Sequence, residues 1–378
     1  MHTRKKILVF ADWFLPGFKA GGPIRSVANL VHSLEIDFWI VTRITDHQTD
    51  EPYAGITPGV WTAHRPNVQV CYLHERDVNS NFLEKIFSEQ SFDHLYFNSL
   101  FSPAFTLQPL RLARKKGLIS RCVLAPRGML KPGALSVKAR KKRIFLFTAK
   151  LLGLFNGIRW HATNEEEAQE IKTHFGNSCV VCVAPNLATA VHSVPNAAQK
   201  LPGELRLVCI ARISSEKGIR EALQFLKAAH LERVECTFYG VRQNKEYLEE
   251  CMALAQQIDG AVISFPGEIT PEAIPAALND AHFFYLPTWG ENFGHAIAEA
   301  LQYGKPVIVS NRTPWINLQS LQAGWDLPLE ATAFVDVLNH CLQMGQEEYT
   351  RMSIAARDYG LSHTQDPAHL RAYYSLFA

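Results

Sequence analysis

Short apolar runs alternate with amphipathic stretches along this chain, and the alternation occurs twice. Each run has the length of a strand, and the later ones are separated by segments with a helical period. Strands that alternate with helices build parallel sheets with helices on both faces. We therefore expect an α/β protein with two doubly wound parallel sheets. The strands are expected at 6–11, 37–42, 68–73, 94–98, 121–125, 179–183, 205–210, 234–239, 261–265, 282–286 and 306–310, and the clearest helices at 217–230, 244–258, 271–280 and 293–303.

The two series are separated near residues 188–204, where small residues, two prolines and the lack of an apolar period indicate a linker. Residues 1–200 carry 25 Lys and Arg against 15 Asp and Glu, whereas the rest of the chain carries 13 and 21, so the charge changes sign at the same place. A chain of 378 residues is also longer than one hydrophobic core usually serves. We predict one domain over 1–190, a second over 204–365, and a C-terminal helix over 366–378.

The basic first half suggests an anionic partner, for which phosphates, acidic lipid and nucleic acid are the candidates. A basic run at 138–143 precedes an apolar stretch that ends at 155. This pattern is typical either of peripheral contact with an anionic membrane or of a domain helix with a solvated basic end. No nucleic-acid-binding module surrounds the run, so we expect no nucleic acid as partner.

The chain has no apolar run as long as a membrane span, and the five-residue run after Lys6 is too short for a signal peptide. We therefore expect a cytoplasmic protein, with the inner face of the membrane as a possible peripheral site. The eight cysteines lie in apolar stretches, and the Cys179-x-x-Cys182 pair has no partner pair at zinc-site spacing. Reduced thiols in the core are the expected state.

Two glutamates, Glu291 and Glu299, follow the strand expected at 282–286. Gly290 and Gly294 predict a tight loop that carries Glu291, with Glu299 further along the next helix. The amino end of that helix offers free N–H groups to a phosphate or a sugar oxygen. Two separated carboxylates suit the hydroxyl groups of two sugars in one ligand. A solvated acidic loop before an ordinary helix is the alternative.

Arg212 and Lys217 lie five residues apart after the strand expected at 205–210, and Gly218 follows them. A planar guanidinium and a compact ammonium around one turn form a pocket for a diphosphate. They would also stabilise the negative charge of a departing nucleoside diphosphate. The alternative interpretation of this pattern is a solvated basic turn.

After the first strand, Gly21-Gly22 lies in a glycine-rich loop that enters a helix. Such a pair lets backbone N–H groups approach an anion closely. The loop lacks the G-x-G-x-x-G spacing, which weakens a nicotinamide or flavin interpretation. Taken alone, the Gly-Gly pair is a weak signal, and a plain turn is the favoured explanation.

The order of these motifs resembles glycosyltransferase family 4, the group 1 glycosyltransferases with the GT-B fold, of the bacterial envelope and exopolysaccharide type. Glu291-x-Phe293-Gly294-x-x-x-x-Glu299 matches the E-x-F-G-x-x-x-x-E motif of that family, and Arg212 with Lys217-Gly218 matches its R-x-x-x-x-K-G. Gly21-Gly22 is similar to its N-terminal Gly-Gly loop, and Pro185-Asn186 to its P-N-G turn, with Leu187 in place of the glycine. The similarity spans about residues 6–378.

The resemblance implies two Rossmann-like domains with a cleft between them and a C-terminal helix that crosses back onto the first domain. It implies that Glu299 binds the ribose, and that Glu291, with Asn292 and the backbone near Phe293 and Gly294, holds the transferred sugar. The remaining implied donor contacts are Arg212 and Lys217 on the diphosphate, Gly21 and Gly22 at the distal phosphate, and Glu268 and Ile269 against the base.

One position departs from the family pattern. Many members place a histidine after the strand in the middle of the first domain, where this chain has Arg127 in Pro126-Arg127-Gly128-Met129-Leu130. Arg127 is therefore a candidate catalytic residue near the reacting phosphate, with a structural or acceptor-side role as the equal alternative. His161 is expected to be a packed residue at a strand end.

The chain contains no D-x-D, the carboxylate pair through which many enzymes hold a nucleotide diphosphate with a metal. Arg212 and Lys217 can supply the positive charge, so we expect neither a metal nor a cofactor. Together with the resemblance, these motifs imply a retaining transferase that moves a hexose, with glucose as the first candidate, from a UDP-sugar to a glycan or lipid-linked acceptor. A sugar-nucleotide epimerase and a non-catalytic nucleotide-sugar-binding protein are the rival hypotheses.

Overall fold

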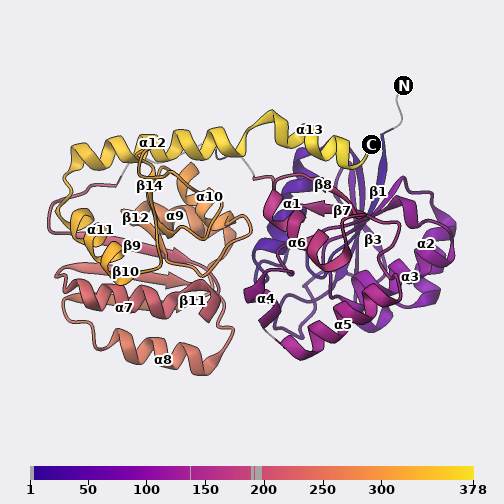
Figure 1. The fold of residues 1–378 in the computed structure, drawn as a ribbon, viewed down its shortest axis with the longest axis horizontal. Coiled ribbons are helices and arrows are strands. Elements are labelled where there is room, and N and C mark those ends of the chain that lie inside the picture. The colour runs from indigo at the N-terminus through magenta and orange to yellow at the C-terminus, as the bar shows by residue number, and fades with distance from the viewer. Residues whose placement is uncertain (1–3, 137, 189–190, 192–197) are drawn as a thin grey trace. The chain divides into compact units, whose positions relative to one another are not determined.

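A computed structural model describes residues 4–136, 138–188, 191 and 198–378 and divides the chain into two compact units (Figure 1). Unit 1 comprises the chain up to residue 187 together with 367–378, and unit 2 comprises 188–366. The chain therefore passes from one unit to the other twice. Of the expected linker, residues 189–190 and 192–197 lie outside the described part.

Unit 1 is built on an eight-stranded sheet with the order β3-β4-β2-β1-β5-β6-β7-β8. Its strand pairs are parallel except for β3 with β4. The order places β1 in the middle of the sheet, so the loops after β1 and β5 lie side by side at the carboxyl edge. The strands are β1 (Lys6–Phe10), β2 (Asp37–Arg43), β3 (Trp61–Arg65), β4 (Val68–Leu73), β5 (His94–Phe97), β6 (Cys122–Leu124), β7 (Arg159–Ala162) and β8 (Val180–Val183).

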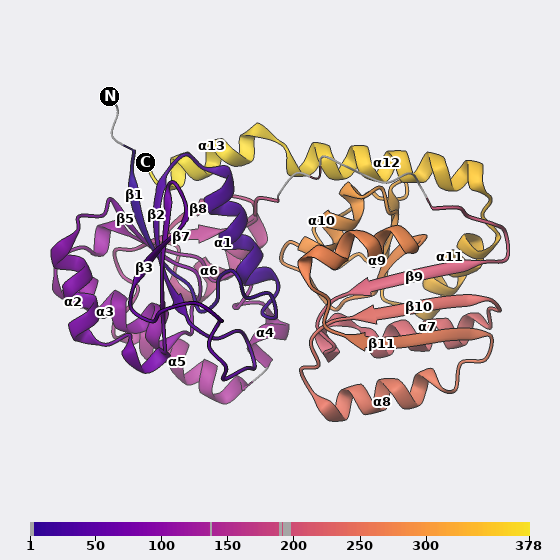
Figure 2. The ribbon, with the colours of Figure 1, turned by 180° about the vertical axis from the view of Figure 1, so that it is seen from behind.

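Successive side chains of β1 point to opposite faces of this sheet, and each face has its own core. Ile7 and Val9 pack in one cluster with residues of α1 and α13, whereas Leu8 and Phe10 pack in another with residues of α2, α3, α5 and α6. Helices therefore cover both faces (Figure 2). The helices are α1 (Gly22–Ser33), α2 (Ser80–Glu89), α3 (Gln108–Lys115), α4 (Pro132–Ser136), α5 (Ala139–Leu151), α6 (Glu165–Phe175) and α13 (Pro367–Leu376).

The C-terminal helix α13 is bound to unit 1 through its last carbonyl groups. Lys5 Nζ donates to Phe377 O over 2.5 Å, and Arg159 Nη1 donates to Leu376 O over 2.5 Å. His94 Nε2 lies 3.0 Å from Phe377 O. Cationic groups at the carboxyl end of a helix donate hydrogen bonds to its free carbonyl groups and interact favourably with the negative end of its dipole.

Unit 2 has a six-stranded, parallel sheet with the order β11-β10-β9-β12-β13-β14. The order reverses between β9 and β12, which are neighbours although they are not consecutive in the chain. Ligands of open α/β sheets bind at such a switch point. The elements are β9 (Leu205–Ile210), α7 (Ile219–Ala229), β10 (Val234–Tyr239), α8 (Lys245–Ala255), β11 (Ala261–Gly267), α9 (Ile274–Asp280), β12 (Phe283–Leu286), α10 (His295–Gln302), β13 (Val307–Ser310), β14 (Gly324–Leu327), α11 (Ala331–Gln343) and α12 (Gln346–Thr364).

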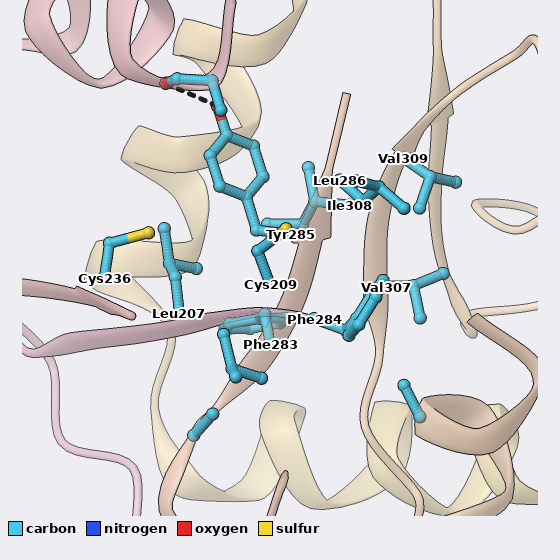
Figure 3. Packing of buried hydrophobic residues seen from close by; sticks show 14 of the residues in the cluster. Leu207, Cys209, Cys236, Phe283, Phe284, Tyr285, Leu286, Val307, Ile308 and Val309 are labelled. Carbon is cyan, nitrogen blue, oxygen red and sulfur yellow. Dashed lines mark hydrogen bonds between the residues drawn. The ribbon is translucent and has the colours of Figure 1, made fainter. Parts of the chain in front are cut away.

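Figure 3 shows the core of unit 2 around β12, whose four residues are all buried. Leu207 and Cys209 of β9 and Cys236 of β10 pack in the same cluster. The hydroxyl of Tyr285 is satisfied inside this cluster, because it donates to Ala222 O over 3.0 Å.

All eight cysteines are free thiols. The parallel sheets and covering helices of the two units confirm the predicted α/β fold class.

Candidate functional site

The loop between β12 and α10 carries Glu291 and is shaped by Gly294. Gly294 adopts a φ of +78° as the residue that caps α10, a conformation that favours glycine. A Cβ there would lie 2.9 Å from Ile297 Cδ1. Trp315 Nε1 donates to Phe293 O over 2.6 Å, and Glu291 N donates to Arg312 O over 3.1 Å. The loop is thus held from two sides, with Glu291 at a fixed backbone position.

The loop after β9 carries Arg212 and Lys217 and ends at Gly218. Gly218 has a φ of +66°, and a Cβ there would lie 1.9 Å from Pro287 O. Only glycine lets this loop approach the Glu291 loop so closely. Thr288 Oγ1 and Trp289 N both donate to Glu216 O, over 3.1 and 3.0 Å. The two loops therefore form one packed structure at the switch point of the sheet.

Across this contact, Lys217 Nζ lies 2.6 Å from Glu291 Oε1, and the two side chains are 16% and 12% exposed. Arg212 Nη2 lies 2.9 Å from Glu216 Oε1, but this pair is 35% and 40% exposed. The structure thus joins Lys217 to Glu291, two residues that the sequence singled out, and places Arg212 on the same loop as Lys217 but paired with Glu216. A partly buried pair is screened little by salt, so Lys217 and Glu291 hold each other more firmly than Arg212 and Glu216 do.

The other site residues predicted in unit 2 lie on the same edge. Asn292 and Phe293 belong to the Glu291 loop, and Glu299 is a partly buried residue one turn inside α10. Glu268 and Ile269 directly follow β11, two strands away from β9. The loops after β9, β10 and β11 are stacked, because Ala211 N donates to Tyr239 O over 3.0 Å and Gly240 N donates to Gly267 O over 2.7 Å.

In unit 1, Gly21 and Gly22 form the amino end of α1. Gly21 has a φ of +68° and caps the helix, whose first turn has no acidic side chain. The loop before it is tied down by Asp46, whose Oδ2 accepts from Phe18 N over 2.9 Å and Lys19 N over 3.2 Å. A twelve-residue helix with this amino end presents free N–H groups and partial positive charge.

Arg127 follows β6, with a φ of +56°, and its guanidinium is hydrogen-bonded to neutral side chains, among them that of Tyr373. Nε donates to Asn98 Oδ1 over 2.7 Å, Nη2 donates to Tyr96 OH over 2.6 Å, and Nη1 donates to Asn186 Oδ1. Asn98 Nδ2 in turn donates to Pro23 O over 3.3 Å. Asn98 therefore joins Arg127 to the start of α1, so the predicted site residues of unit 1 form one group.

His161, predicted to be a packed residue, is fully buried behind this group. Its Nδ1 lies 2.8 Å from Tyr96 OH, and its Nε2 lies 2.8 Å from Ala184 O. Burial, and secondarily the nearby charge of Arg127, lowers the pKa of His161 to about 3. The ring is therefore neutral at physiological pH. Burial also raises the pKa of Tyr96, which stays protonated.

Sequence reasoning missed several residues of these two groups: Asn98, Tyr96, Asp46 and Glu216. Asn98 ended an expected strand at the carboxyl edge, which was the one signal available for it. Glu167, also missed, is fully buried, and its carboxylate accepts from Gly128 N over 2.5 Å and from Thr163 N over 2.7 Å. It fixes the backbone next to Arg127.

The described residues offer neither a candidate metal centre nor a candidate membrane span. No group of three or more His, Cys, Asp or Glu side chains is arranged to hold a metal ion there. None of the helices in the described ranges combines the length and the apolar character needed to cross a membrane.

Two Rossmann-like units with these topologies define the GT-B class of fold, and solved structures of that class align with the whole chain. The sucrose-phosphate synthase of Thermosynechococcus elongatus is 15% identical with a TM-score of 0.70, over 99% of this chain and 98% of that one. HepE of Anabaena, in complex with UDP and glucose, is 16% identical with a TM-score of 0.67, over 98% and 100%. The trehalose-6-phosphate synthase OtsA is 9% identical with a TM-score of 0.69, over 98% of both chains.

Residues 195–358 match the model of the family described as glycosyl transferases group 1. The match covers most of unit 2, including Arg212, Lys217, Glu291 and Glu299. No curated protein matches the sequence significantly. Unit 2 therefore carries the sequence pattern of group 1 glycosyltransferases, and the fold of both units agrees with it.

Proposed function

We propose that this protein is a retaining glycosyltransferase of family 4 that transfers a hexose, with glucose as first candidate, from a UDP-sugar. The observation that carries the proposal is the Lys217–Glu291 pair at the switch point of the unit 2 sheet, with Arg212 on the same loop as Lys217. A carboxylate and two cations are the groups needed to hold a sugar and a diphosphate together. The match of residues 195–358 to group 1 glycosyltransferases supports the same assignment.

Each part of the UDP-sugar would bind to a different group of residues. Arg212 and Lys217 bind the diphosphate, Glu299 binds the ribose, and Glu291 binds hydroxyls of the hexose. Asn292 and the backbone N–H groups near Phe293 and Gly294 assist Glu291, and Glu268 and Ile269 lie against the base. In unit 1, the backbone at Gly21 and Gly22 binds the distal phosphate.

Arg127 would add positive charge to the unit 1 side of the reaction. In the described part of the chain its hydrogen bonds go to neutral side chains, so its charge is not neutralised by a directly bonded carboxylate. When UDP leaves, the developing charge on its distal phosphate is stabilised by Arg212, Lys217 and Arg127 without a metal. The acceptor hydroxyl attacks from the face that UDP leaves, which retains the anomeric configuration.

The acceptor would be a glycan or a lipid-linked oligosaccharide of envelope or exopolysaccharide synthesis. The sugar would be transferred to it on the cytoplasmic side of the membrane. HepE of Anabaena, whose structure holds UDP and glucose, supports UDP-glucose as the first donor to test. A lipid-linked acceptor also requires contact with a membrane, for which residues 138–155 are the candidate segment.

The experiment is donor hydrolysis followed by ¹H NMR with UDP-, GDP- and ADP-sugars, in the presence and absence of EDTA. We expect UDP-glucose to be hydrolysed with or without EDTA, and α-glucose to appear before the anomers equilibrate. The Arg212→Ala/Lys217→Ala variant should abolish the reaction. Interconversion of free UDP-sugars would indicate an epimerase instead, and binding without turnover of donor in any mixture of acceptors would indicate a sensor.

A further inference from the structure

Helix α5 exposes a row of large apolar side chains to solvent. Ile144, Phe147, Leu151 and Leu152 are 64%, 69%, 73% and 79% exposed. Spacings of three, four and seven residues place Ile144, Phe147 and Leu151 along one side of the helix, and Leu152 caps its carboxyl end. Exposed apolar residues are common singly, but a contiguous row of this kind marks an interaction surface. We call these four residues the α5 apolar row.

The opposite side of α5 is firmly packed, so the exposure of the row is a property of a well-anchored helix. Leu146 and Ala149 are buried in the core of unit 1. The Phe145 ring contacts that of Phe101, with centroids 5.5 Å apart. Lys142 Nζ donates to Ala134 O over 2.6 Å and fixes the first turn. The helix therefore holds the apolar row outward.

The surroundings of the row are strongly basic. Between Asp93 and Glu165 the chain contains 14 Lys and Arg and no Asp or Glu. Four of these cations are exposed on α5 itself: Arg140, Lys141, Arg143 and Lys150. The end of α5 also meets the basic helix α3, because Arg114 Nη2 donates to Leu154 O over 3.1 Å and to Asn156 O over 2.7 Å. Lys115 and Lys116, next to Arg114, are exposed as well.

We infer that α5 docks unit 1 on a lipid bilayer that carries anionic headgroups. The apolar row would enter the boundary between headgroups and acyl chains, while the flanking lysines and arginines bind phosphate groups above it. A second copy of this chain fits the surface poorly, because two such faces would bring like charges together. The bilayer is the one occupant that offers both an apolar interior and a layer of negative charge.

The position of α5 in the fold links this surface to the site in unit 1. The helix lies in the connection from the carboxyl end of β6 to the amino end of β7, so it begins on the edge where Arg127 lies. Docking through α5 would therefore bring that edge close to lipid headgroups. This last step rests on the proposed lipid-linked acceptor, whereas the docking itself does not.

The test is co-flotation of the full-length protein with vesicles of phosphatidylcholine alone, or with about one-third phosphatidylglycerol. We expect binding to the anionic vesicles, little binding to the neutral ones, and loss of binding as salt rises from ~0.05 to ~0.5 M. Phe147→Ser/Leu151→Ser should weaken binding tenfold or more. Met252→Ser/Ile354→Ser, which removes side chains that are 45% and 59% exposed on helices α8 and α12, is the matched control and should bind as the wild type does.

UDP binding and the thermal midpoint are measured on the same samples. An unchanged midpoint shows that the Phe147→Ser/Leu151→Ser protein is folded, and unchanged UDP binding separates loss of docking from loss of the donor site. The inference is wrong if the wild type does not bind anionic vesicles, or if this variant binds as well as the control. It is also wrong if the wild type sediments as a dimer that the variant converts to a monomer, since the row would then join two copies.

Discussion

Lys217 Nζ donates a 2.6 Å hydrogen bond to Glu291 Oε1 although the two residues are 74 positions apart in the chain. The bond joins the loops that follow β9 and β12, which are neighbouring strands at the switch point of the sheet. It therefore places the groups proposed for the diphosphate and for the hexose in direct contact.

The first prediction separates the roles of these two residues. Glu291→Gln should reduce donor turnover by ~10²-fold and leave UDP affinity nearly unchanged, because Glu291 holds the hexose and UDP lacks it. Lys217→Ala should reduce both quantities, because the ammonium binds the diphosphate. Calorimetric titration with UDP and initial hydrolysis rates measure them. Equal effects of the two substitutions on UDP affinity would contradict the division of roles.

Gly218 should be irreplaceable for stability. A Cβ there would lie 1.9 Å from Pro287 O, and its φ of +66° disfavours other residues. We expect Gly218→Ala to lower the free energy of unfolding by more than ~2 kcal/mol in urea denaturation. Gly133→Ala is the control, since nothing lies within 4 Å of its Cβ position, and it should change stability by less than ~0.5 kcal/mol. A Gly218→Ala protein as stable as this control would show that the two loops separate readily.

His161 should make the free energy of unfolding depend on pH in the acid range. Its folded-state pKa is about 3, whereas an unfolded histidine has a pKa of about 6.5. Between these values the unfolded chain binds a proton that the folded protein does not, so stability falls as pH drops below ~6.5, by up to ~1.4 kcal/mol per pH unit. His161→Gln should make the slope between pH 6 and 4 shallower, while the slopes between pH 7 and 9 stay equal. Identical slopes in the acid range would show that His161 accepts a proton in the folded state.

Arg127 should be replaceable by lysine only at a cost to turnover. One ammonium cannot reach Asn98, Asn186 and Tyr96 as the guanidinium does. We expect Arg127→Lys to lose ~1–3 kcal/mol of stability and at least ~10-fold in turnover. UDP affinity should fall less than turnover, because lysine keeps the positive charge and the proposed base, ribose and cation contacts of UDP lie in unit 2. Arg76→Lys, at a side chain that is 82% exposed, should change none of the three. Full activity of Arg127→Lys would reduce Arg127 to a structural residue.

Much of the fold was predictable because its strands are apolar and its helices periodic. Strands β4, β9 and β10 were predicted with the bounds they have. Three strands were not among the expected ranges, although His161 of β7 was expected at a strand end. β3 (Trp61–Arg65) is an antiparallel edge strand with mostly exposed residues, and β7 (Arg159–Ala162) and β14 (Gly324–Leu327) have only four residues each. Short or exposed strands depend on their neighbours in the sheet, which the local pattern does not reveal.

The site was predictable where a motif is continuous in sequence, as around Glu291 and Lys217. Their contact was not, because it depends on β9 and β12 being neighbours although two other strands lie between them in the chain. The same holds for Arg127, whose partners Asn98 and Asn186 are 29 and 59 residues away. Arg212 pairs with Glu216, which lies four residues further along the chain. A search for oppositely charged residues at this spacing would have predicted the pair, but it was missed.

The measurement that tests the central claim most directly is the shift in unfolding free energy on addition of UDP, GDP and ADP. At about 100 times its dissociation constant, UDP should stabilise the wild type by ~2.7 kcal/mol and should not stabilise the Arg212→Ala/Lys217→Ala variant. If no nucleoside diphosphate stabilises the wild type, or if UDP stabilises the double variant equally, the carboxyl edge of unit 2 is not a site for a nucleotide-activated sugar.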